Sequence, residues 1–138
     1  MAMVLNDFEL LNSALSGNRR DLSKILTAIE GGDSFEMGPQ DPWTLGVTGP
    51  PGVGKSSLIG RLISKWIDRG EKVAVLAVDP SSPNSGGALL ADRMRMGATD
   101  SSDSVFVRSL ATRNHPGGMA PRLSPMIECL AACGWSRI

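Results

Sequence analysis

Residues 49–56 read G-P-P-G-V-G-K-S, which matches the spacing G-x-x-x-x-G-K-S. In such a segment consecutive backbone N–H groups can curl around an anion, because glycine permits unusual backbone angles and lets an oxygen approach the main chain. A helix that begins at the end of the segment adds partial positive charge. The pattern therefore predicts a P-loop, a binding site for the phosphates of a nucleoside triphosphate. A glycine-rich turn that merely joins a strand to a helix would need neither this spacing nor the lysine-serine pair.

Individual roles follow from the chemistry of the side chains. Lys55 falls in the first helical turn, where the helix dipole disfavours a cation, so a bound phosphate must compensate its charge. We assign Lys55 to the β- and γ-phosphates as the catalytic residue, the Ser56 hydroxyl to Mg²⁺, and Ser57 to the α-phosphate. The residues expected to contact the nucleotide are Gly49, Pro50, Pro51, Gly52, Val53, Gly54, Lys55, Ser56 and Ser57.

Two aspartates are candidates for completing a metal site with Ser56. Asp79 follows an apolar run and would end a parallel strand at the edge where α/β sheets bind ligands, so it is expected to hold Mg²⁺ directly or through water. An Asp-Pro turn cap is the alternative for this residue. Asp92 lies in a short expected helix, residues 88–96, after a glycine-rich loop; it could reach the nucleotide or be simple surface charge. His115, alone in a loop, receives no role.

The elements that must position these residues are visible in the hydrophobic pattern. Residues 43–48 are typical of a short strand, the P-loop follows, and apolar residues then recur at helical spacing up to Gly70. Residues 72–78 form an almost unbroken apolar run, which is typical of a parallel strand covered by helices on both faces. The sequence thus predicts an α/β fold of the P-loop NTPase type, with a mostly parallel sheet and flanking helices.

The remaining segments extend this fold on both sides. Residues 1–30 show two helical patterns separated by Gly17, and a connector rich in glycine and proline follows. We therefore divide the chain into an N-terminal helical segment, residues 1–38, and a partial P-loop domain, residues 39–138. A third strand is expected at 104–109, then a helix that begins at Ser124 as N-cap and ends near Cys133. Residues 135–138 resemble the first half of another strand, so we expect the chain to be truncated.

Composition narrows the classes of partner. Fourteen basic and fourteen acidic residues give a formal net charge of zero among 138 residues, which argues against nucleic acid or an anionic membrane as partner. No apolar stretch approaches the ~20 residues that cross a bilayer, and no secretory leader is visible. The two cysteines, Cys129 and Cys133, are expected to be buried thiols in a reducing compartment. We therefore expect a cytoplasmic protein.

Four segments together resemble one known family. The P-loop at 49–57, V-L-A-V-D-P-S-S-P at 75–83, S-G-G at 85–87 and D-R-M-R-M at 92–96 resemble the MeaB/ArgK family of P-loop GTPases. That family is associated with the coenzyme-B12-dependent methylmalonyl-CoA mutase; older labels describe a transport-system ATPase or kinase. The resemblance implies a G-protein chaperone that binds GTP and Mg²⁺, gates cofactor loading, and protects methylmalonyl-CoA mutase or a related B12-dependent mutase.

The resemblance also implies a homodimer for the full-length protein, metal-site roles for Asp79 and Asp92, and a nucleotide-sensing switch at 80–96. The chain departs from the family at Pro116, Pro121 and Pro125, and it lacks the family's Glu-Thr-Val-Gly segment, guanine-reading motif and C-terminal arm. Without that motif the residues present do not distinguish GTP from ATP. Two alternatives therefore stay open: an ATP-dependent kinase or transport ATPase, and a truncated, non-catalytic fragment.

Overall fold

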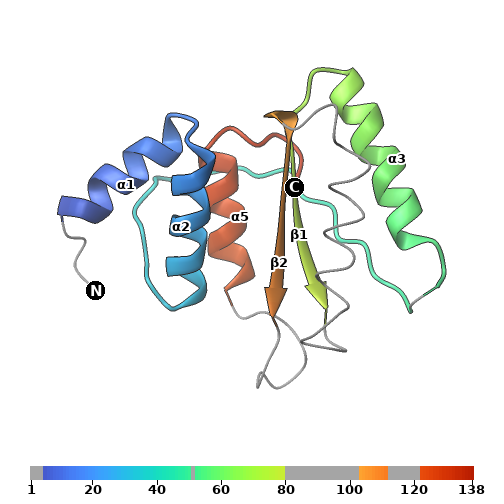
Figure 1. Ribbon diagram of the computed structural model, residues 1–138, viewed down its shortest axis with the longest axis horizontal. Helices are drawn as coiled ribbons and strands as arrows, with labels where there is room; N and C mark the ends of the chain where they lie inside the picture. Colours follow the sequence, from blue (N-terminus) through green and yellow to red (C-terminus); the bar gives the residue numbers. More distant parts are fainter. Residues whose placement is uncertain (1–4, 51, 80–102, 112–121) are drawn as a thin grey trace.

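The computed structural model describes residues 5–50, 52–79, 103–111 and 122–138, and the structural statements below concern these residues. Within them lie four helices and two strands (Figure 1). In chain order they are α1 (Leu5–Leu15), α2 (Arg19–Glu30), α3 (Lys55–Asp68), β1 (Val73–Asp79), β2 (Val105–Ala111) and α5 (Leu123–Ala132).

Strands β1 and β2 pair in parallel, in a register that runs from Val73 opposite Val105 to Asp79 opposite Ala111. Side chains of a strand alternate between the two faces of a sheet. Accordingly Ala74 and Phe106 pack in one core cluster with residues of α2 and α5, whereas Val73, Val75, Val105 and Val107 pack in a second cluster with Ile63 of α3. In Figure 1, α1, α2 and α5 lie on one side of the sheet and α3 lies on the other. The prediction of a parallel sheet covered on both faces is confirmed.

The two N-terminal helices form as their apolar periodicity predicts. Asn18 caps α2 by accepting a hydrogen bond of 3.0 Å from the backbone N–H of Asp21. The apolar stripe of α2 is buried at 2% exposure or less, and it consists of Leu22, Ile25, Leu26 and Ile29. On α1, Leu11 is buried, but Phe8 and Leu15 remain 56% and 38% exposed. The stripe of α2 is therefore the main contribution of this segment to the core.

Two arginines tie α2 to the sheet and to α5. Arg108 of β2 makes hydrogen bonds of 3.0 and 2.7 Å to Oε1 of Glu30, and it donates to the Thr27 hydroxyl. Arg122, just before α5, donates to the carbonyl oxygens of Ile29 and Asp33 at 3.1 and 2.9 Å, which satisfies carbonyl groups at the end of α2. The N-terminal helices, β1, β2 and α5 thus share one hydrophobic cluster and several polar contacts.

Residues 43–48 do not form the expected strand, and this prediction is wrong. The pairing here is confined to two hydrogen bonds: the N–H of Leu45 donates to the Ile138 carbonyl at 2.9 Å, and the N–H of Ile138 donates to the Trp43 carbonyl at 3.1 Å. Residue 137 forms a parallel bridge with Val73 on its other side. Residues 137–138 therefore lie between β1 and residues 43–45. A strand needs a ladder of such bonds along its length, and residues 46–48 have none in the described part of the chain.

The remaining boundaries agree closely with expectation. Helix α3 ends before Gly70, whose φ of 79° favours glycine. Helix α5 begins at Leu123 with Arg122 at its N-cap, so the predicted Ser124 cap is wrong by two residues.

Cys129 and Cys133 are buried free thiols, as expected. The helix expected at 88–96 lies outside the described residues. Among the helices that the structure describes, none is long and apolar enough to cross a bilayer.

Candidate nucleotide-binding site

The predicted P-loop leads directly into α3. The described part of the loop comprises residues 49–50 and 52–54, and α3 begins at Lys55. Helix α3 runs in the opposite direction to β1, so its first turn lies toward the end of the molecule at which β1 and β2 end, to one side of the strands (Figure 1). Ligands of open α/β sheets bind at this carboxyl edge. The loop thus occupies the place at which a phosphate site is expected.

Three glycines of the loop adopt positive φ angles that other residues rarely use, and Gly49, with a φ of 153°, is the first of them. Gly52 has a φ of 82° and Gly54 a φ of 93°, both in the left-handed region. A Cβ atom added at either position would meet no atom within 4 Å, so the requirement for glycine is conformational rather than steric. At Gly49 a Cβ would instead touch the Val53 Cγ2 at 3.4 Å and the Lys55 Cδ at 3.6 Å. The glycines therefore shape the loop that residues 49–55 form.

The first turn of α3 offers backbone donors and a cation. Gly54 is the N-cap and has no side chain to satisfy the first N–H groups, and the turn contains no acidic residue. The Lys55 ammonium folds back over the loop and donates a hydrogen bond to the Gly49 carbonyl. The amides of this same loop are predicted to hold the phosphates. This arrangement of amides, helix dipole and ammonium can bind an anion.

The other predicted site residues are only partly placed. Ser56 is half-buried and Ser57 is exposed, both in the first turn of α3 beside Lys55. Asp79 is the last residue of β1, at the same edge of the sheet as the loop. The Asp79 side chain, together with Pro51 and Asp92, lies outside the described part of the chain. The structure thus assembles the loop and the first turn of α3, while the acidic ligands stay predictions.

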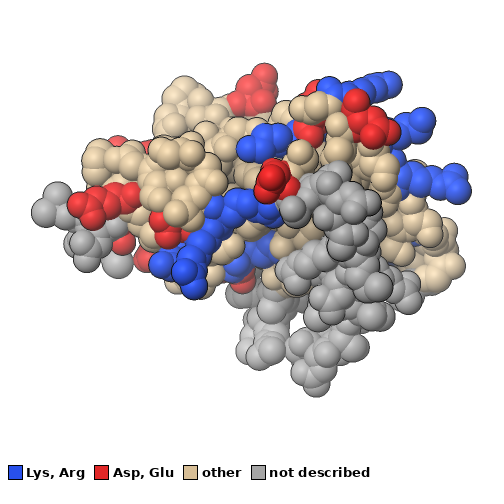
Figure 2. Space-filling model, turned by 45° about the horizontal axis from the view of Figure 1, so that its top comes forward, with Lys and Arg blue, Asp and Glu red and all other residues tan. Residues whose placement is uncertain are grey.

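Sequence reasoning missed a group of residues at the opposite edge of the sheet, where β1 and β2 begin. Arg19, Lys72, Cys133 and Trp135 line a cavity there. They come from segments far apart in the sequence, so no local pattern reveals them. Figure 2, in which this edge is turned forward, shows lysine and arginine interspersed with acidic residues. The missed residues form a second candidate site.

The sheet is parallel and carries helices on both faces, and a glycine loop leads into α3. Together these features define an α/β protein of the P-loop NTPase class. Residues 36–138 match the family model described as methylmalonyl-CoA mutase-associated GTPase MeaB. Because the match covers most of the chain, the protein belongs to the MeaB family of GTPases, and the resemblance seen in the sequence is confirmed.

Three relatives illustrate this membership. A protein of Pyrococcus horikoshii described as a GTPase is 40% identical over 91% of this chain and 42% of its own length. The GTPase ArgK of Escherichia coli is 41% identical over 66% of this chain and 28% of its own. The fused isobutyryl-CoA mutase of Cupriavidus metallidurans is 37% identical over 92% of this chain but only 12% of its own length. The chain thus spans less than half the length of these relatives.

Proposed function

We propose that residues 49–57 bind GTP with Mg²⁺ and that this site supports GTP hydrolysis. The observation that carries the proposal is the loop itself: it combines two left-handed glycines, the uncapped start of α3 and a Lys55 ammonium that donates to the Gly49 carbonyl. The choice of GTP rests on the family and on relatives described as GTPases. The loop geometry supports the binding of phosphates, and the family assignment supports GTP as the nucleotide that carries them.

Each residue of the proposed site would have its own role. The backbone amides of the loop and of the first turn would hold the phosphate oxygens, and Lys55 would bind the β- and γ-phosphates. Ser56 would offer its hydroxyl to Mg²⁺, with Asp79 and Asp92 as oxygen donors, a set that suits a hard cation. Bound Mg²⁺ would neutralise charge that develops on the phosphates during transfer. The chain's own contribution is thus positioning and electrostatic stabilisation.

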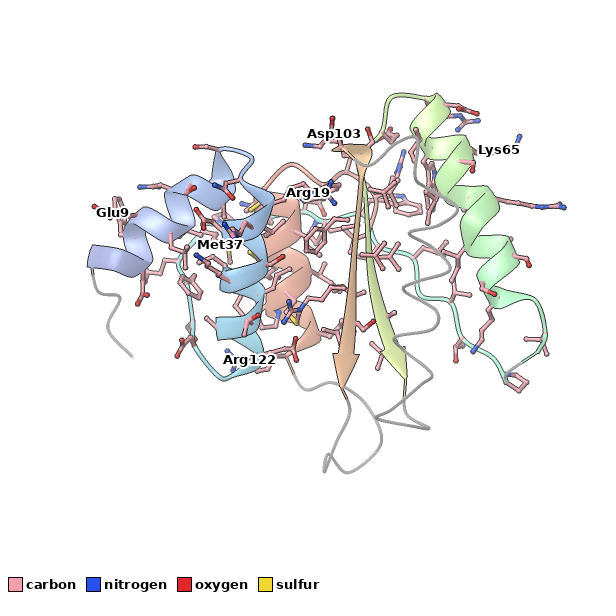
Figure 3. The ribbon with its side chains drawn as sticks, viewed as in Figure 1. Glu9, Arg19, Met37, Lys65, Asp103 and Arg122 are labelled. Carbon is pink, nitrogen blue, oxygen red and sulfur yellow. The ribbon has the colours of Figure 1, made fainter. Side chains whose placement is uncertain are left out.

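A titration with fluorescent GTP and ATP analogues tests the nucleotide proposal. We expect the chain to bind both nucleotides in the presence of Mg²⁺, because a P-loop contacts the phosphates, and we expect the full-length protein to prefer GTP. Lys55→Ala should weaken binding roughly 10- to 100-fold, since a hydrogen bond to a charged group contributes about 1.5–3 kcal/mol. Lys65→Ala is the matched control because Lys65 is an exposed residue in the last turn of the same helix (Figure 3). Equal loss in both variants, or no binding by the unmodified chain, would contradict the proposal.

We further propose a role for the whole protein as a cytoplasmic G-protein chaperone of a B12-dependent acyl-CoA mutase, acting as a homodimer. The support is the family description and the presence of a matching segment within fused isobutyryl-CoA mutases. A fusion keeps two functions in one molecule, so it is consistent with physical association of the GTPase and the mutase. The test is co-purification of the protein with the mutase of its own organism, with and without a non-hydrolysable GTP analogue. Failure to associate in either state would overturn this role.

A further inference from the structure

The cavity at the edge where β1 and β2 begin has a volume of about 240 Å³. We call it the Trp135 cavity and define it by its chemically active lining residues: Asn18, Arg19, Lys72, Asp103, Cys133 and Trp135. Since a water molecule takes ~30 Å³ of liquid volume, the space corresponds to roughly eight waters, enough for part of a small organic molecule. The cavity lies at the opposite end of the strands from the P-loop (Figure 3). Its contents would therefore not compete with the proposed nucleotide.

The charged lining of the cavity favours an anion. The guanidinium carbon of Arg19 lies 5.7 Å from the ring centroids of both Phe106 and Trp135, and the Lys72 Nζ lies 4.9 Å from the Trp135 centroid. Contacts of this kind hold cations on the faces of aromatic rings. Among the described lining residues there is one carboxylate, Asp103. Arg19 also donates a hydrogen bond to the Val105 carbonyl, so the exposed Lys72 ammonium is the cation that a carboxylate of the ligand would meet first.

The cavity also contains a thiol that can react. Cys133 retains 8% of its exposure and lines the cavity, whereas Cys129, one helical turn earlier, is fully buried. A hydrogen bond from the Cys129 thiol, assisted by the charge of Lys72, lowers the pKa of Cys133 although burial opposes this change. The same hydrogen bond and burial raise the pKa of Cys129. Because Cys133 borders the cavity and Cys129 is fully buried, Cys133 is the member of the pair that a reagent can reach, and the thiolate is the nucleophilic form.

We propose that the Trp135 cavity is a modification site in which Cys133 forms a mixed disulfide with an anionic low-molecular-weight disulfide. The Cys133 Sγ attacks one sulfur of the bound disulfide and forms a new S–S bond. The original S–S bond breaks, and its electron pair leaves with the second sulfur, which takes a proton from water. The small disulfide is itself the oxidant, so no other co-reactant is needed. Lys72 and Arg19 select the reagent by attracting its carboxylates.

Mass spectrometry of the folded chain after incubation with oxidised glutathione is the first test. We expect a single mixed disulfide on Cys133, which Cys133→Ser abolishes and Cys129→Ser does not. Reaction at Cys129 in preference to Cys133, or no adduct on the folded chain, would overturn the proposal. The glutathione reagent carries carboxylates, and bis(2-hydroxyethyl) disulfide serves as the neutral reagent for comparison. The ratio of the two rate constants then reports the charge of the cavity separately from thiol reactivity.

Charge selection is tested by Lys72→Gln, with Lys65→Gln as the matched control on exposed α3. One charge removed at short range should lower the anionic-to-neutral rate ratio about three- to fivefold in Lys72→Gln and leave it unchanged in Lys65→Gln. In the unmodified chain the ratio should also fall as salt is raised to ~1 M, where the Debye length is only about 3 Å. That second measurement does not depend on the folding of a variant. A ratio unaffected by salt would count against the proposal.

Discussion

At the residue scale, Gly54 separates the effect of backbone conformation from that of packing. Its φ is 93°, yet a Cβ there would contact nothing within 4 Å. Gly60, in the middle of α3, is likewise free of neighbours within 4 Å, but its φ is not in the left-handed region. The same substitution by alanine therefore tests only the backbone.

We expect Gly54→Ala to destabilise the chain by ~1–2 kcal/mol, the cost of a left-handed conformation for a residue with a Cβ. We expect Gly60→Ala to stabilise it by ~0.5–1 kcal/mol, because alanine restricts the unfolded chain and favours a helix. Denaturant unfolding measures both. Two changes of the same sign would show that the loop does not hold Gly54 in the conformation described.

At the element scale, the pair formed by Arg108 and Glu30 joins β2 to the end of α2. Their side chains are 19% and 31% exposed and lie 2.7 Å apart, so the pair is partly shielded from water. In a double-mutant cycle with Arg108→Met and Glu30→Gln we expect a coupling of roughly 0.5–1 kcal/mol that diminishes at high salt. Lys24 and Asp21 provide the control: their atoms are 3.7 Å apart and Lys24 is 60% exposed, so the coupling should be near zero. Equal couplings would contradict this ranking.

Helices and strands could be predicted where the sequence pattern that indicates them lies within one continuous segment. Helices α2 and α3 and strands β1 and β2 each carry their own apolar pattern, and the P-loop is contiguous, so all could be found from the sequence. Residues 43–48 carry a strand-like pattern too, but strand formation depends on partners, and in the described part of the chain Ile138 alone supplies backbone hydrogen bonds to them. The contacts of Arg108 and Arg122 with α2 span about 80 to 90 residues and leave no local trace. The Trp135 cavity was invisible for the same reason.

At the scale of the whole molecule, one hydrophobic cluster contains residues of α1, α2, β1, β2 and α5. Ile25 of α2 is fully buried in it, whereas Phe8 of α1 is 56% exposed. We expect Ile25→Ala to cost ~2–5 kcal/mol, because it removes buried methyl groups and leaves a cavity. Phe8→Ala should change stability by less than about 0.5 kcal/mol.

The shape of the unfolding transition tests whether the N-terminal helices and the sheet share one core. If the core is shared, far-ultraviolet circular dichroism, which follows the helices, and tryptophan fluorescence, recorded with Trp43→Phe and Trp66→Phe so that it follows Trp135 near β2, should report one coincident unfolding transition in Ile25→Ala. Two separate transitions would instead support residues 1–38 as an independent unit, as the division made from the sequence implies.

Nucleotide binding should stabilise the molecule as a whole, since a ligand that binds only the folded state adds RT ln(1 + [L]/Kd) to its stability. At a hundredfold excess over Kd this contributes about 2.7 kcal/mol, which for a chain of this length raises Tm by roughly 8 °C. We expect thermal melts with Mg²⁺ and GTP to show this increase, EDTA to reduce it, and Lys55→Ala to remove most of it while Lys65→Ala retains it. Because Lys55 also contacts the Gly49 carbonyl, the melt of Lys55→Ala without ligand measures that contact separately. An unchanged Tm at saturating GTP would mean that the loop does not act as a nucleotide site in this chain.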